Sequence, residues 1–220
     1  IERQSLNRNL NSYFTLTANK NYGDFSLSGT LGNEVLSNFD RSLSVTGTSI
    51  TVPGFDNLKN FTTFNTNSSY RRERMMGVFG DISVGYKSYL NLNVKARNDF
   101  SSTLSKANRS IFYPAVALSF VVTDAFPSLK SKFINSAKIR ANVGEVGKGT
   151  SPYNLNSVYG TAGATDGFSS TAVNFPFNGL AGFTYGNSAG DINITPEFTR
   201  EMELGTELSL LNNRLSLDLS

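Results

Sequence analysis

Apolar and polar residues alternate with a period of two along most of this chain, and helical periodicity is nearly absent. In the segment 74–86, for example, Met76, Val78 and Ile82 fall on one face, and Asp81 and Ser83 fall on the other. The alternation predicts eight strands, at 10–19, 24–34, 74–86, 89–99, 112–122, 136–145, 200–211 and 213–220. Most have 8 to 13 residues, close to the roughly 9–11 that a tilted strand needs to cross a bilayer.

The same alternation places most charges of the predicted strands on one face. If the strands span a membrane, the apolar face meets lipid, with Val94 and Leu118 as examples, and the polar face meets a wet lumen, with Asn93 as an example. The predicted lumen-facing charges are Asp81, Lys95, Arg97, Lys138, Arg140, Glu201, Glu203 and Glu207. They are interpreted as cross-strand pairs or as a ladder that guides a substrate. Antiparallel pairing of 136–145 with 200–211 would bring Arg140 within about two residues of Glu203.

Connection length also alternates along the chain. Short turns are predicted at Asn19–Gly23, at Lys87–Ser88 and at the Asn212–Asn213 dipeptide, since Asn tolerates the positive φ of tight hairpins. Long connections are predicted at 35–73, 100–111 and 146–199. The segment 123–135 has intermediate length and is expected to hold one helical turn. Outer-membrane barrels sort their connections in this way, with short periplasmic turns and long extracellular loops, whereas a β-sandwich has no reason to do so.

Composition removes several functional classes. Among the 220 residues there is no Cys, His or Trp, which removes the usual neutral-pH base, thiolate chemistry and the commonest metal ligands. We therefore expect neither an enzyme nor a cofactor or metal site. The net charge of +3 is too small to indicate a nucleic-acid partner. The mean hydropathy of −0.22 suits a barrel, because half of each strand faces water.

Three further features invite a functional interpretation. GEVGKGT at 144–150 is not a P-loop, because Asn142 replaces the required first Gly and Gly149 replaces the Ser or Thr after Lys148. An arginine run at the start of the third predicted strand is interpreted as a lipid A contact or as a solvated rim; it comprises Arg71, Arg72 and Arg74. Aromatic residues in the long loops are interpreted as contacts to a substrate or a partner protein, or as small loop cores; they are Phe55, Phe61, Tyr153, Tyr159, Phe168, Phe175, Phe177, Phe183 and Tyr185.

Four blocks of the sequence stand out: KSYLNLNVKARNDFSS, NRSIFYPAVALSFVVTDAF, SAKIRANVGEVGKG and ITPEFTREMELGTELSLLNNRLSLDL. They resemble, in the same order, blocks of SusC/RagA-like TonB-dependent transporters. They cover about half of the chain, between Tyr89 and Leu219. Phe100 stands where the family usually has Gly, and Phe120 stands where it usually has Trp; both departures affect only local packing.

The resemblance implies a bacterial outer-membrane protein whose 22-stranded barrel is closed by a plug. It also implies a SusD-like surface lipoprotein as a lid, energy from the TonB complex, and import of an oligosaccharide or a peptide. The polar start at Ile1 and the final NRLSLDLS, which stops in mid-alternation, lead us to expect a piece of a longer protein without its plug. The whole chain is then part of one all-β barrel domain. The alternative is a secreted carbohydrate-binding β-sandwich.

Overall fold

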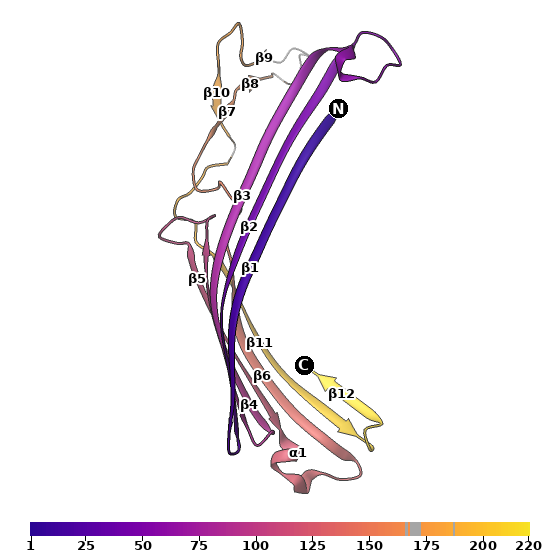
Figure 1. Ribbon diagram of the computed structural model, residues 1–220, viewed down its shortest axis with the longest axis vertical. Helices are drawn as coiled ribbons and strands as arrows, with labels where there is room; N and C mark the ends of the chain where they lie inside the picture. The colour runs from indigo at the N-terminus through magenta and orange to yellow at the C-terminus, as the bar shows by residue number, and fades with distance from the viewer. Residues whose placement is uncertain (166, 168–172, 187) are drawn as a thin grey trace.

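A single antiparallel sheet of eight strands forms most of the molecule in the computed structural model, which describes residues 1–165, 167, 173–186 and 188–220. Each strand pairs with its neighbour in the chain, apart from β6, which pairs with β11 across a long connection (Figure 1). The strands are β1 (Glu2–Tyr22), β2 (Phe25–Ile50), β3 (Phe61–Tyr86), β4 (Leu90–Ser101), β5 (Ser110–Val121), β6 (Ile134–Lys148), β11 (Glu197–Leu210) and β12 (Leu215–Leu219). The predicted all-β antiparallel fold is therefore confirmed.

The predicted number and order of the main strands are correct, but the first three strands are much longer than predicted. β2 and β3 stay paired along their whole length: Phe25 pairs with Tyr86 at one end, and Ile50 pairs with Phe61 at the other. The predicted long loop at 35–73 is therefore wrong, and the connection is only 51–60, closed by the short 3-10 helix η1 (Leu58–Asn60). The error has a physical reason. In this half of the hairpin neither face is continuously apolar, so the alternation that marks a strand fades although backbone pairing continues.

The two ends of the sheet differ, but less than predicted: the connections 51–60 and 102–109 are shorter than 122–133 at the opposite end, and only 149–196 is long. One end carries the turns at Gly23–Asp24, at 87–89 and at 211–214, with positive φ at Gly23, Lys87, Ser88, Asn212 and Asn213. The helical turn expected near 123–135 is present as α1 (Val122–Ala125), followed by the 3-10 turn η2 (Pro127–Leu129). The connections 51–60, 102–109 and 149–196 lie toward the other end, where β1, β2 and β3 rise beyond β4 and β5 (Figure 1).

A row of aromatic rings crosses the sheet at the end with the short turns. Phe25 packs on Tyr86 at 4.8 Å between ring centroids, and Tyr86 packs on Tyr89 at 5.6 Å. The row continues with Phe120, whose ring centroid lies 6.0 Å from that of Tyr89, and ends with Phe126, whose ring centroid lies 6.5 Å from that of Phe120. Such girdles mark the polar boundary of the apolar band in membrane barrels. The row therefore gives a reference level from which the height of other residues can be counted.

The two faces of the sheet differ sharply, and the sheet has no apolar core. Register places Val84, Leu92 and Leu118 side by side on one face, and Ile82, Val94 and Val116 in the next row. Apart from the half-buried Val84, these side chains are exposed to a third or more. Within the described part of the chain the only buried hydrophobic residues are Leu104 and Ile111. A β-sandwich needs a second sheet packed on its apolar face. The sandwich alternative is therefore wrong.

No helix in the described residues is long and apolar enough to span a membrane.

Depth along the apolar face gives a graded prediction. Leu118 lies two residues from Phe120 of the aromatic row. Leu90 pairs with Phe120 and so marks the same level on β4, and Val94 lies four residues from Leu90. An arginine on the lipid face costs about 2–4 kcal/mol at the midplane and about 0–1 near the interface. In the full-length protein, Val94→Arg should therefore destabilise more than Leu118→Arg, and Asn93→Arg on the polar face should destabilise least. Denaturant titration of the detergent-folded protein measures the order, and equal losses for all three would show that the faces are misassigned.

Candidate functional site

The polar face of β2–β5 carries a compact charge network around Arg97 of β4. Its guanidinium bonds Glu34 of β2 at 2.8 Å and Asp99 at 2.7 Å, and it lies 5.7 Å above the ring of Phe79. The Tyr113 hydroxyl donates a hydrogen bond to the buried Asp99 carboxylate. Arg97 is therefore fixed by neighbours on four strands.

A hollow of about 510 Å³ opens beside this network. Its lining includes Thr30, Phe79, Lys95, Arg97 and Tyr113. Lys95 bonds Asp81 at 3.3 Å, and the Asn93 amide donates to the same carboxylate at 3.0 Å. The hollow therefore has an aromatic wall and charged groups that already hold partners.

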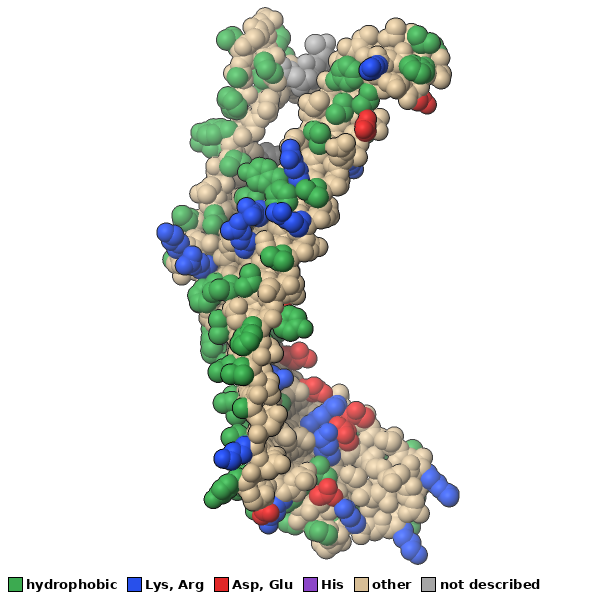
Figure 2. Space-filling view, viewed as in Figure 1, with side chains coloured by type: hydrophobic (Ala, Val, Ile, Leu, Met, Phe, Trp, Pro, Cys, Tyr) green, Lys and Arg blue, Asp and Glu red, His purple; other side chains and the backbone are tan. Residues whose placement is uncertain are grey.

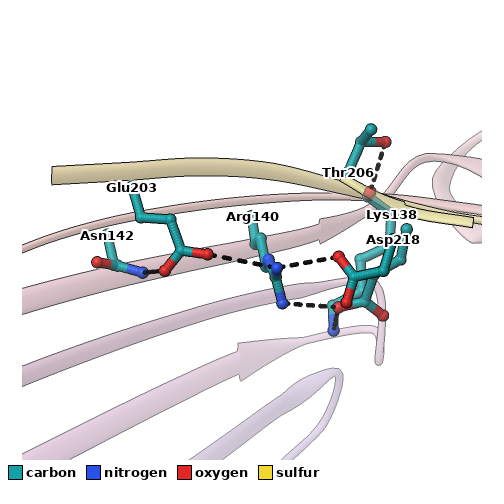
Figure 3. A network of polar contacts seen from close by, with 7 residues as sticks. Lys138, Arg140, Asn142, Glu203, Thr206 and Asp218 are labelled. Atoms are coloured by element: carbon teal, nitrogen blue, oxygen red, sulfur yellow. Dashed lines mark hydrogen bonds and ion pairs between the residues drawn. The ribbon is translucent and has the colours of Figure 1, made fainter. Parts of the chain in front are cut away.

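A second network joins β6, β11 and β12 around Arg140 (Figure 3). The register pairs Arg140 with Gly205, and the guanidinium reaches Glu203 at 3.3 Å, Glu207 at 3.6 Å and Asp218 at 3.0 Å. Lys138 bonds Glu207 at 3.1 Å. The predicted adjacency of Arg140 and Glu203 is confirmed. Asp218 on β12 was not among the predicted charges, although its alternation with Leu217 and Leu219 could have identified it.

Two glycines make room for the two arginines. A Cβ on Gly77 would collide with the Arg97 guanidinium and the Asp99 carboxylate, and a Cβ on Gly205 would collide with the Arg140 side chain. Each arginine therefore lies across a neighbouring strand where that strand has no side chain. A glycine inside a strand weakens it unless another group approaches closely, and here that group is a guanidinium.

The predicted lumen charges are therefore mostly paired with one another. Of the eight predicted residues only Glu201 has no ion pair among those found in the described part of the chain, and the sequence prediction missed Glu34, Asp99 and Asp218 as partners. Neutralised pairs fix the geometry of a wall and leave little free charge to attract a solute. No cluster of metal-binding side chains occurs in the region described.

The long connection from β6 to β11 divides into a neck, residues 149–157 and 190–196, and a tip, residues 158–189. Two bonds close the neck: Asp191 N–H donates to the Asn154 carbonyl at 3.1 Å, and Gly190 N–H donates to Ser157 Oγ at 3.0 Å. The Asn108 amide bonds the carbonyls of Asn193 and Ile194, each at 3.1 Å. The neck is therefore attached to the neighbouring loop, and the tip projects from it.

Aromatic side chains gather on one small ladder of the tip. β7 (Tyr159–Thr161) pairs with β10 (Phe183–Tyr185) and sets Tyr159 opposite Tyr185. Their rings lie 4.4 Å apart, their hydroxyls lie 2.6 Å apart, and both are exposed. The hydrogen bond to Tyr185 raises the pKa of the Tyr159 hydroxyl. With Phe183, these rings form an exposed aromatic surface that can stack on a ligand or on a partner protein.

The other predicted aromatic contacts do not join this surface in a single site. Tyr153 belongs to the neck: its hydroxyl accepts a hydrogen bond from Arg72 N–H at 3.0 Å. Phe61 covers Gly47, and Phe175 covers Gly182, so both serve local packing. Phe55 lies in the 51–60 connection. Phe177 forms an isolated β-bridge with Leu180. This bridge follows β9 (Val173–Asn174), which pairs with β8 (Gly163–Ala164). Phe168 lies outside the described residues.

The predicted arginine run does not lie at the start of a strand and does not share one face. β3 begins at Phe61, so Arg71, Arg72 and Arg74 lie inside it. Arg71 lies on the polar face and bonds Glu73 at 3.6 Å. Arg72 and Arg74 lie on the same face as Met76, which is the apolar face, and they stand above the apolar rows. The sequence alternation could have separated them, had the strand been recognised as starting earlier.

The Arg140 network gives a testable prediction. Arg140→Met leaves Glu203 and Asp218 without a cation and should lower the free energy of unfolding by about 1–2 kcal/mol, as the sum of several cross-strand pairs. Arg200→Met is the matched control, because exposed Arg200 pairs with no described carboxylate other than Glu145, at 2.9 Å, and such pairs contribute up to about 1 kcal/mol. Denaturant midpoints of the detergent-folded protein measure both, and an equal loss would contradict the assigned role of Arg140.

Comparisons with known proteins support one family. TonB-dependent receptor P26 from Formosa agariphila is 27% identical over 172 residues, which are 76% of this chain and 16% of that protein. TonB-dependent receptor P3 from the same organism is 30% identical over 156 residues, 68% of this chain and 14% of that protein. The chain therefore spans less than a fifth of the length of these relatives.

Solved structures share the fold. The structure of the RagAB peptide transporter aligns with a TM-score of 0.79 at 18% identity and covers 98% of this chain and 23% of that one. The RagAB peptide importer in its open-open state aligns with a TM-score of 0.70 at 17% identity over the same shares of the two chains. The family described as TonB dependent receptor-like, beta-barrel, matches residues 2–220. This chain belongs to that family and forms transmembrane strands of a bacterial outer-membrane β-barrel, similar to SusC/RagA-like receptors.

Proposed function

We propose that this chain forms about a third of the barrel wall in a TonB-dependent importer of oligosaccharides or peptides. The remaining strands of a 22-stranded barrel, the plug and the TonB-contacting segment belong to parts of the protein outside this chain. A SusD-like lipoprotein covers the outer mouth. The family supports TonB-dependent import as the general activity, and the TM-score of 0.79 to the RagAB peptide transporter supports the closer analogy.

The two-faced sheet is the observation that carries the proposal. One face has rows of exposed apolar side chains above an aromatic row, and the other has paired charges and a hollow. Such a sheet is stable where lipid covers the first face and a wet or plugged interior meets the second. β1 and β12 are the edges of the sheet, and an unpaired edge in hydrocarbon leaves backbone groups unsatisfied. We therefore infer that further strands continue the ladder on both sides.

The connections supply the orientation. By the usual asymmetry, the end with short turns faces the periplasm, and the end with connections 51–60, 102–109 and 149–196 faces outward. The far ends of β1–β3 and the tip then project outside the cell (Figure 1). The tip carries the exposed Tyr159–Tyr185 pair on a neck fixed by hydrogen bonds. We assign the tip to contact with the lid lipoprotein or with the captured solute.

The charged inner face is assigned to the plug. Its cations are held by carboxylates on neighbouring strands, so the wall keeps its shape when the plug moves. Glu201 and the hollow beside Arg97 remain as polar contacts for groups of the plug. In this assignment energy from TonB acts on the plug, and the wall remains a rigid frame.

Removing the tip tests the proposal. Gly190 N–H bonds Ser157 Oγ at 3.0 Å, so a short Gly-Ser joint between these residues can replace 158–189 without disturbing the neck. In the full-length receptor we expect the barrel to insert and to keep its heat-resistant gel mobility. Uptake of the oligosaccharide or peptide, or co-purification of the lid lipoprotein, should fall about tenfold or more, since exposed aromatic anchors dominate such contacts.

A point variant separates the contact from the deletion. Tyr159→Ala with Tyr185→Ala removes the exposed pair and should reduce the same readout. Phe61→Ala is the matched aromatic control, because its ring covers Gly47 within the β2–β3 hairpin. If uptake and lid association are both unchanged after tip deletion, the tip has only a local structural role, and this part of the proposal fails.

A further inference from the structure

Four arginines lie on the outward face of β1–β3, in three consecutive rows. Arg8, Phe39 and Arg72 form one row across the three strands. The guanidinium carbon of Arg8 lies 5.5 Å from the Phe39 ring centroid, and that of Arg72 lies 6.0 Å from it. Arg41 occupies the row above, beside Tyr70, and Arg74 occupies the row below. We call these four residues the arginine cluster: Arg8, Arg41, Arg72 and Arg74.

Among the residues that the structure describes, the cluster has no counter-charge. None of its members forms an ion pair with another residue that the structure describes, whereas Arg71 on the opposite face bonds Glu73. All four side chains are exposed. Figure 2 shows basic side chains gathered midway along the molecule, with no acidic side chain among them on the face shown. Four unpaired guanidinium groups this close repel one another unless an anion joins them.

An apolar hollow of about 460 Å³ adjoins the cluster at Arg74. Its floor includes Val35, Met76 and Phe100, and its rim includes Lys106 and Arg109 from the 102–109 connection. A ligand in this hollow would meet apolar side chains on the membrane side and cations on the outer side. Phosphate fits such a rim, because guanidinium forks bond phosphate oxygens in pairs.

The height of the cluster matches the outer surface of the membrane. Arg74 lies about twelve residues along β3 from Tyr86 of the aromatic row, or about 40 Å at 3.3 Å per residue. With the usual tilt of about 35–45°, this corresponds to a height of about 30 Å, just above an apolar band of about 25 Å. The cluster therefore stands at the level of headgroups in the outer leaflet.

We propose that the arginine cluster, with Lys106 and Arg109, binds the phosphate groups of a phosphorylated glycolipid of the outer leaflet, that is, lipid A. The acyl chains lie along Val35, Met76 and Phe100, and the phosphates lie between the cations. The site rests on the outer-membrane location of the barrel and is independent of the imported solute. Tyr153 of the neck packs against Tyr70 at 6.3 Å and bonds Arg72 N–H, so the bound lipid also abuts the base of the long connection.

Co-purified lipid in matched double variants of the full-length receptor tests the proposal. Arg72→Gln with Arg74→Gln removes two charges from the cluster, and Arg3→Gln with Arg71→Gln removes two from the opposite face of the same strands. After extraction in mild detergent, lipid A is quantified by mass spectrometry. The first variant should retain about tenfold less lipid A than wild type, and the second should retain about the wild-type amount. Arg74→Gln alone provides the test if the double variant does not insert.

Titration of delipidated receptor identifies the recognised group. Purified lipid A should bind about tenfold more tightly than lipid A with its phosphates removed. Millimolar inorganic phosphate should not displace it, because the acyl chains add apolar contacts. Equal binding of the two lipids, equal lipid loss in the two double variants, or displacement by phosphate would each overturn the proposal. So would unchanged lipid in the Arg72/Arg74 variant together with loss of the lid lipoprotein, which would assign the cluster to a protein partner.

Discussion

Hydrogen bonds between the backbones of neighbouring strands hold this structure together, and every other feature depends on them. Only Leu104 and Ile111 are buried among the hydrophobic residues described, so no apolar core holds the strands in place. The ladder fixes an alternation of side chains between two faces. In hydrocarbon this ladder is obligatory, because an unpaired backbone group has no water to bond. Lipid on one face and the barrel interior on the other then provide what a core provides elsewhere.

The inner face satisfies its charges without burying them in a core. Arg97 and Arg140 each span adjacent strands and bond several carboxylates. Gly77 and Gly205 leave the space that these side chains occupy. Charge and backbone therefore act together, since each arginine reinforces the register of strands that the ladder already pairs. This arrangement suits a wall that keeps its shape.

The β2–β3 hairpin meets a different environment at each level. Near the short turns it carries apolar rows and an aromatic boundary. Above these rows it carries Arg41, Arg72 and Arg74 of the arginine cluster, and higher still it continues as a polar ladder to the 51–60 connection. The neck of the long connection docks at the arginine level through Tyr153. In the proposed orientation, one hairpin thus links lipid, headgroup level and the outer surface in a single register.

The sequence by itself determined the fold class, the number and order of the main strands, the polar and apolar faces, and the ends that carry the tight turns and the longest connection. It could do so because period-two alternation and turn residues such as Asn212 and Asn213 are local signals. It also placed Arg140 near Glu203, since antiparallel pairing follows from strand order. It failed for the upper halves of β2 and β3, where neither face needs to be continuously apolar and the pattern fades.

Only the tertiary structure decided which partners meet across strands and loops. Glu34 reaches Arg97, and Asp218 reaches Arg140, through registers that no local signal specifies. Tyr159 and Tyr185 pair across 26 residues of chain, and Tyr153 docks 81 residues from Arg72. The split of the arginine run between two faces likewise required the true start of β3. These contacts depend on loop paths and strand register, which are properties of the assembled sheet rather than of any segment of its sequence.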